Sequence, residues 1–136
     1  MIIEANWGLG ESVVGGEAMP DVYILEKGSL KIIDRKLGTK GKYIAFKETG
    51  VAEKEAPTEK RCTFCLSDEE AEEIGRLGKI LESHFDVPQD TEWAVDQDLN
   101  FPENVILLQT RPEVIAQKKN PTDQVIDLML TKFIGR

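Results

Sequence analysis

The chain has 136 residues, which is enough for one modest domain with its own hydrophobic core. Its 17 lysines and arginines against 25 aspartates and glutamates give a net charge of −8, without the basic cluster that a nucleic-acid-binding protein carries. No apolar run approaches the roughly 18 residues that a membrane-spanning helix needs, and the amino end lacks the pattern of a secretory signal. We therefore expect a cytoplasmic protein that binds neither nucleic acid nor membrane, and the sequence leaves the oligomeric state open, a homo-oligomer included.

The amino end is predicted to be a strand, residues 2–7, followed by the stretch Gly8-Leu9-Gly10-Glu11. Glycines after a strand let backbone amides approach a phosphate group, particularly when a helix follows. The stretch is neither the dinucleotide-binding fingerprint nor a Walker A sequence, so a tight turn is the alternative interpretation. Because the pattern starts inside a strand, we expect the domain to be cut out of something larger or to be a split subunit.

A hairpin is predicted next, with arms at residues 21–26 and 30–35 around a Lys27-Gly28-Ser29 turn. The loop at residues 36–42 is rich in glycine and lysine, which would suit a phosphate-binding loop. We interpret it as a solvated turn because no strand-to-helix context follows it.

Two further short strands are predicted at residues 43–47 and 51–56, around Glu48-Thr49-Gly50. Lysine and glutamate recur along this stretch, and charged side chains protect strand edges from pairing with other chains. We therefore expect this region to form an exposed sheet edge.

The two cysteines of the chain form the stretch Cys62-Thr63-Phe64-Cys65. A zinc ribbon would need a second pair of ligands, and His84 is the single histidine of the sequence. A redox motif of the thioredoxin type would begin a helix, whereas here Ser67, just downstream, is the expected helix cap. We interpret the cysteines as reduced, partly buried thiols.

The stretch Ser67-Asp68-Glu69-Glu70 is a capping box and predicts a helix over residues 68–85. The apolar stripe of this helix recurs at three- and four-residue spacing and consists of Ala71, Ile74, Leu77, Leu81 and Phe85. We expect Gly75 and Gly78 to allow a close approach to the sheet. We expect His84 to interact with the helix terminus or solvent, and a catalytic base is the alternative.

A third hairpin is predicted between residues 89–96 and 105–112. Because side chains alternate faces along a strand, every second residue of each arm shares one face, and most of these residues are polar. These are Asp90, Glu92, Ala94 and Asp96 on the first arm and Leu107, Gln109 and Arg111 on the second. If Asp96 lies opposite Val105, Glu92 lies opposite Gln109. Carboxylate and amide oxygens suit Mg²⁺ and arginine suits phosphate, whereas the alternative is the solvated face of a half-buried sheet.

Three separated motifs resemble the nucleotide-binding domain of phosphoenolpyruvate synthase and pyruvate, phosphate dikinase. They are Glu4 to Gly16 closing with Pro20-Asp21, Cys65 to Glu70, and Asp90-x-Glu92-Trp93 followed by Leu108-Gln109-Thr110-Arg111-Pro112. The resemblance covers roughly residues 2–113 and occurs in the family's order. The tail, Phe101 to Asn104 with Asp123 to Phe133, looks most like the nucleotide-binding subunit of phenylphosphate synthase.

The resemblance implies an ATP-grasp site for ATP and Mg²⁺. By family position, Glu92 and Gln109 hold the metal ion, Arg111 contacts phosphate and is the catalytic residue, and Asp90 is a supporting acid. The same resemblance places the loop with Gly8, Gly10 and Glu11 in the nucleotide site. The histidine that the family phosphorylates lies in a separate domain, so His84 is not that residue.

The fold that we expect is α+β: an ATP-grasp-like lobe over residues 1–113, with a mainly antiparallel sheet packed against one long helix. Residues 114–136 are expected to form a linker and an amphipathic helix after residue 121. The resemblance implies the ATP-binding part of a phosphotransferase that passes phosphate through a histidine to pyruvate or a similar acceptor. Its partners would be the missing amino-terminal lobe and the phosphohistidine domain, so the chain is not expected to be active alone. The alternatives are a non-catalytic interaction module and a fragment of a phenylphosphate synthase subunit.

Overall fold

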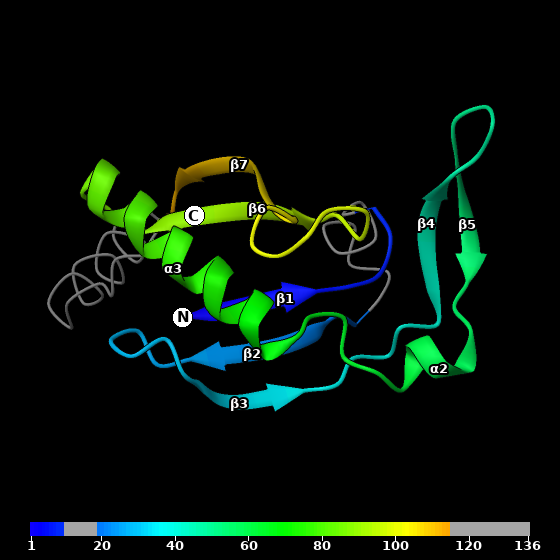
Figure 1. Cartoon of the computed structure of the whole chain (residues 1–136), viewed down its shortest axis with the longest axis horizontal. Coiled ribbons are helices and arrows are strands. Elements are labelled where there is room, and N and C mark those ends of the chain that lie inside the picture. Colours follow the sequence, from blue (N-terminus) through cyan, green and yellow to red (C-terminus); the bar gives the residue numbers. More distant parts are fainter. Residues whose placement is uncertain (10–18, 115–136) are drawn as a thin grey trace, which may run out of the picture.

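The computed structural model describes residues 1–9 and 19–114 (Figure 1). The elements are β1 (Ile2–Ala5), β2 (Asp21–Leu25), β3 (Ile32–Lys36), β4 (Lys42–Phe46), β5 (Val51–Glu55), α2 (Thr58–Arg61), α3 (Asp68–Phe85), β6 (Gln89–Val95) and β7 (Val105–Pro112). The described strands form a β1-β2-β3 sheet and the separate pairs β4-β5 and β6-β7, all antiparallel. The α+β prediction, with antiparallel strands and one long helix, is confirmed. The helix predicted after residue 121 lies outside the described residues.

The predicted hairpin at residues 21–35 is confirmed as β2 and β3, although β3 starts only at Ile32. The chain turns later than expected because Glu26 organises the connection. Its carboxylate accepts the backbone N–H groups of Gly28 and Ser29, and its carbonyl accepts the Leu30 N–H at 2.8 Å. The hydrogen bonds from Ser29 and Gly28 lower the pKa of Glu26 to about 2.

Helix α3 starts where the capping box predicts, with Ser67 and Glu70 exchanging both hydrogen bonds. In Figure 1 the helix crosses one side of the strands, and it packs against β2, β6 and β7. A Cβ atom at Gly75 would lie 2.9 Å from Leu25, so a close approach to the sheet is confirmed there. A Cβ at Gly78 would meet only Met1, at an ordinary 3.7 Å, so this glycine is not required by packing.

His84 lies on the exposed surface near the end of α3, with its ring edge-on to Phe85 at 4.8 Å between centroids. The helix ends at Phe85, and the next residue, Asp86, adopts a left-handed conformation. The exposure agrees with the expectation that His84 faces solvent.

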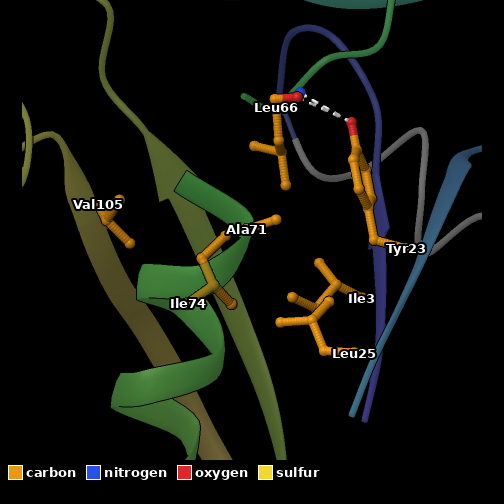
Figure 2. Close-up of a cluster of buried hydrophobic side chains, with 7 residues drawn as sticks. All are labelled: Ile3, Tyr23, Leu25, Leu66, Ala71, Ile74 and Val105. Carbon is orange, nitrogen blue, oxygen red and sulfur yellow. Dashed lines mark hydrogen bonds between the residues drawn. The ribbon is translucent and has the colours of Figure 1, made fainter. Parts of the chain in front are cut away.

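The hydrophobic core lies between α3 and the strands, as Figure 2 shows. Its buried members are Ile3, Tyr23, Leu25, Leu66, Ala71, Ile74 and Val105. The Tyr23 hydroxyl donates to the Leu66 carbonyl at 3.2 Å and accepts from the Leu66 N–H at 3.0 Å. Burial raises the pKa of Tyr23 to about 12. This satisfied hydroxyl fixes the segment that leads into α3 against the central strand β2.

The hairpin of β4 and β5 projects away from the rest of the molecule (Figure 1). The strands are those predicted, but they form a two-stranded sheet of their own instead of the edge of a larger one. A backbone hydrogen bond from Leu9 N to Ile44 O at 2.8 Å joins β4 to the segment after β1, and one from Ala56 N to Gly41 O at 2.9 Å closes the base of the hairpin itself. Among the described residues, no helix has the length and apolar character needed to cross a membrane.

Candidate functional site

The β6–β7 hairpin places the predicted polar residues opposite one another. Glu92 pairs with Gln109, and Asp90 pairs with Arg111. All four side chains are exposed to solvent. The central expectation from the sequence, a carboxylate beside an amide with a guanidinium two residues along, therefore agrees with the backbone register.

The pair of residues from which the sequence analysis derived this register is wrong. Val95, and not Asp96, lies opposite Val105, because β7 carries an extra residue between its pairings with Glu92 and Trp93. The skipped residue is Leu108, whose side chain is 62% exposed. This is a β-bulge, in which two residues of one strand lie opposite one residue of the other.

The bulge changes which side chains share a face. Leu107 lies opposite Trp93, so it belongs to the face that turns toward the core and not to the face of Gln109, as the sequence predicted. Trp93 and Val95 pack against the core from this side, where Val105 is buried. The extra residue therefore lets the hairpin keep polar residues outward at one end and apolar residues inward at the other.

Arg111 is held beside this pair by Asp90. The guanidinium Nε and Nη2 lie 2.9 and 2.8 Å from the same oxygen, Oδ2 of Asp90. Both side chains are more than half exposed, so the ion pair contributes at most about 1 kcal/mol to stability. Its effect is to orient the guanidinium on the face that carries Glu92 and Gln109.

The donor set fits a hard cation that takes most of its ligands from elsewhere. Glu92 offers a carboxylate and Gln109 an amide oxygen, and Mg²⁺ prefers one or two protein oxygens completed by water and substrate phosphates. Within the described ranges, no cluster of three or more histidine, cysteine, aspartate or glutamate side chains forms a complete metal cage. The hairpin can thus contribute to a metal–phosphate site but cannot enclose a metal ion by itself.

Gly8 follows β1 and has a left-handed conformation, with φ of 75°. A Cβ atom here would lie 2.3 Å from the carbonyl oxygen of Ile44 and 2.9 Å from the ring of Tyr43. Only glycine allows this approach of the chain to β4. The other two residues predicted in this loop, Gly10 and Glu11, lie outside the described residues.

A buried ion pair was missed by the sequence analysis. Lys40 lies in the loop interpreted as a solvated turn, yet its side chain is 0% exposed and so is that of Asp21. The Nζ atom of Lys40 lies 2.8 and 2.7 Å from the two carboxylate oxygens. The sequence did carry a signal: Asp21 alternates with Tyr23 and Leu25 on the buried face of β2, and a buried carboxylate needs a cationic partner.

Asp21 accepts two further hydrogen bonds, from the backbone N–H groups of Gly38 and Cys65, each at 2.8 Å. Burial by itself would raise the pKa of Asp21, but the bonds from Lys40 and these amides hold it below its ordinary value. Lys40 also donates to the Thr63 carbonyl. The pair therefore joins the start of β2 to the loop before β4 and to the segment that leads into α3.

The cysteines differ in environment. Cys62 is exposed, so the expectation of a partly buried thiol is wrong for it, whereas Cys65 is partly buried and its thiol donates to Ala5 O at 3.8 Å. Burial, with the neighbouring Asp21, raises the pKa of Cys65 to about 12. Both are free thiols, as predicted.

Comparison of the sequence with those of known proteins shows the family to which the chain belongs. The sequence model of one protein family, the pyruvate phosphate dikinase AMP/ATP-binding domain, matches residues 1–131. A probable phosphoenolpyruvate synthase of Methanothermobacter thermautotrophicus is 37% identical over 99% of this chain and 19% of its own length. A probable phosphoenolpyruvate synthase of Staphylothermus marinus is 35% identical over 85% of this chain and 16% of its own. An uncharacterised phosphotransferase of Bacillus subtilis is 34% identical over 96% of this chain and 15% of its own. The chain thus spans less than a fifth of these relatives.

Proposed function

Because the chain belongs to the pyruvate phosphate dikinase AMP/ATP-binding domain family, we propose that it binds Mg·ATP as one part of a phosphotransferase. The observation that carries this proposal is the pairing of Glu92 with Gln109, next to Arg111, on one exposed face of the β6–β7 hairpin. A face that served only as the wet side of a sheet would not need these three groups together.

Each residue has a distinct role in the proposal. Glu92 and Gln109 direct oxygen atoms at Mg²⁺, which in turn binds the phosphate groups. Arg111 neutralises phosphate charge as a planar fork, and Asp90 orients it. In phosphoryl transfer the protein mainly positions the reactants and stabilises charge, so these roles suffice for a nucleotide-binding part. Gly8 is proposed to belong to the same nucleotide site, as are Gly10 and Glu11, which lie outside the described residues.

The remaining parts of the machinery are proposed to lie elsewhere. The relatives are more than five times as long as the segment that they share with this chain. We place the second ATP-grasp lobe and the phosphohistidine domain on the same or a separate chain, and we name pyruvate or a similar small acceptor as the final substrate. The chain alone is then expected to bind nucleotide weakly and to complete no reaction cycle.

The first test is a calorimetric titration of the chain with Mg·ATP. Glu92→Gln removes the charge of the proposed metal ligand, and Glu72→Gln makes the same change on the exposed surface of α3 as a matched control. We expect weak binding that Glu92→Gln abolishes and Glu72→Gln leaves unchanged. Omission of Mg²⁺ should likewise abolish the binding of ATP to the wild type.

A chimera tests the proposal in a protein that supplies the missing lobe. In it, this chain replaces the matching segment of the Methanothermobacter phosphoenolpyruvate synthase. We expect phosphoenolpyruvate formation that is lost in Gln109→Ala and in Arg111→Lys. A correctly folded chimera and a chain that both fail to bind ATP would overturn the proposal in favour of the interaction-module alternative. Full turnover by the isolated chain would contradict the proposal that the second lobe and the phosphohistidine domain are needed for the reaction.

A further inference from the structure

Two lysine side chains meet the ring of Trp7, the residue that precedes Gly8. The Nζ atom of Lys40 lies 5.9 Å from the ring centroid, and that of Lys60 lies 5.0 Å from it. Lys60 also lies 5.4 Å from the ring of Tyr43 on β4. The Trp7 indole N–H donates to the Lys60 carbonyl at 2.8 Å. Lys60 is therefore held between the end of β1 and the strand on which Gly8 packs.

The two ammonium groups differ in the charge that they can offer to a ligand. Lys40 is fully buried and its charge is neutralised by Asp21. Lys60 keeps part of its surface exposed, and among residues 1–9 and 19–114 its ammonium group has no carboxylate partner and no hydrogen-bond acceptor. The rings attract the cation without neutralising its charge, so the charge of Lys60 remains available to a ligand.

The position of this cation relates it to the nucleotide site. Gly8 approaches β4 so closely that its Cβ position would meet both Ile44 O and the Tyr43 ring, the same ring that lies against Lys60. Tyr43 thus lies next to both Gly8, which belongs to the proposed nucleotide loop, and the unneutralised ammonium group of Lys60, in a chain of net charge −8. Lysine serves phosphate groups as a mobile point charge, whereas arginine binds them as a fork.

We propose that Lys60 is a phosphate-contacting residue of the nucleotide site, with its ammonium group held toward the ligand by the rings of Trp7 and Tyr43. The inference rests on the proposed function and adds a second cation, independent of Arg111 on the β6–β7 hairpin. Its ligand class is the polyphosphate of a nucleoside triphosphate. Lys60 then favours ATP over nucleosides without phosphate, because only the phosphate groups meet its charge.

The test compares three ligands with Mg²⁺ present: ATP, AMP and adenosine. Lys60→Gln removes the charge, Lys60→Arg keeps the charge and the ring contacts, and Lys47→Gln makes the same charge change at an exposed position of the β4–β5 hairpin. Calorimetric titrations are made on the chain and on the chimera, so that a need for the missing lobe does not decide the outcome. The thermal unfolding midpoint of each variant reports any loss of structure.

In Lys60→Gln we expect ATP affinity to fall about tenfold, which corresponds to one lost phosphate contact, with adenosine affinity unchanged. Lys60→Arg and Lys47→Gln should bind ATP within about threefold of the wild type. A structural role alone would lower the affinities for ATP and adenosine equally, and that result overturns the inference. Wild-type ATP binding that Lys60→Gln leaves intact overturns the inference and leaves the proposed function standing. Absence of ATP binding in both the wild-type chain and the chimera overturns both.

Discussion

Asp21 and Lys40 form a salt bridge in which neither side chain is exposed to solvent, with Nζ 2.7 Å from Oδ2. The carboxylate also receives the N–H groups of Gly38 and Cys65, and the ammonium group lies 5.9 Å from the Phe64 ring centroid. Removal of both charges from water is costly, and these added hydrogen bonds offset that cost. The bridge therefore joins three segments that are distant in sequence, and its loss should affect the whole domain.

The first prediction concerns variants in which only one residue of the buried ion pair is replaced. Lys40→Met leaves the Asp21 carboxylate buried without its cation and should lower the free energy of unfolding by about 3–5 kcal/mol. The double variant Asp21→Asn/Lys40→Met should lose less than the sum of the single variants, because no unpaired charge remains. Urea unfolding followed by circular dichroism measures each value. As a control, Arg111→Met breaks an exposed ion pair and should cost at most about 1 kcal/mol.

Acid should weaken the fold through Asp21. Its pKa in the folded chain lies below the ordinary 3.8, so the folded state binds its proton less readily than the unfolded state does. This contribution to stability is fully present above pH 3.8 and is lost as the pH falls below it toward the folded pKa. Unfolding free energies measured between pH 2 and pH 7 should fall on the acid side.

Substitutions of single carboxylates separate the contribution of Asp21 to acid unfolding from that of other carboxylates. The acid slope should become shallower in Asp21→Asn. Glu26→Gln is the comparison, because the pKa of Glu26 is also low, at about 2, while its side chain is exposed in a turn. An Asp21→Asn variant with the wild-type slope below pH 3.8 would contradict the role given to the buried pair.

Gly8 provides a prediction about backbone conformation. Gly8→Ala forces an alanine into a left-handed conformation and places its Cβ 2.3 Å from Ile44 O, so the loss of stability should exceed that of strain alone. Gly50→Ala isolates the strain, because Gly50 has φ of 86° but open space around its Cβ position, and should cost about 1–2 kcal/mol. Gly41→Ala, which meets nothing within 4 Å, should be close to neutral. Equal losses for Gly8 and Gly50 would show that the contact with β4 contributes nothing.

The two thiols should differ sharply in reactivity. With its pKa raised to about 12, Cys65 carries on the order of a thousandfold less thiolate at pH 8 than an ordinary cysteine. Iodoacetamide should therefore modify the exposed Cys62 in the native chain and leave Cys65 intact, while both react in urea. Peptide mass spectrometry measures the two rates, and Cys62→Ser provides the background for Cys65 alone. Native alkylation of both residues at similar rates would mean that Cys65 is not protected as described.

Local patterns predicted the elements well because their causes are local. The capping box of Ser67 and Glu70 placed the start of α3, and the alternation of residues predicted the β6–β7 hairpin. The sequence also predicted that Glu92 would lie opposite Gln109, but it did so from a starting pair that was wrong by one residue, and the bulge at Leu108 offset that error. The metal and phosphate roles of these residues remain predictions.

Only the tertiary structure showed where the register of the β6–β7 hairpin shifts and which polar residues are buried. The bulge at Leu108 depends on how Trp93 packs against the core, and Lys40 is buried because Asp21 enters the interior from a strand 19 residues away. Neither event leaves a periodic pattern, since each reflects a balance between desolvation and contacts with distant segments. The sequence by itself predicted the strands, the long helix α3 and the residues of the candidate site, although it missed the short helix α2. Packing determined which face each side chain occupies and which partner each buried charge has.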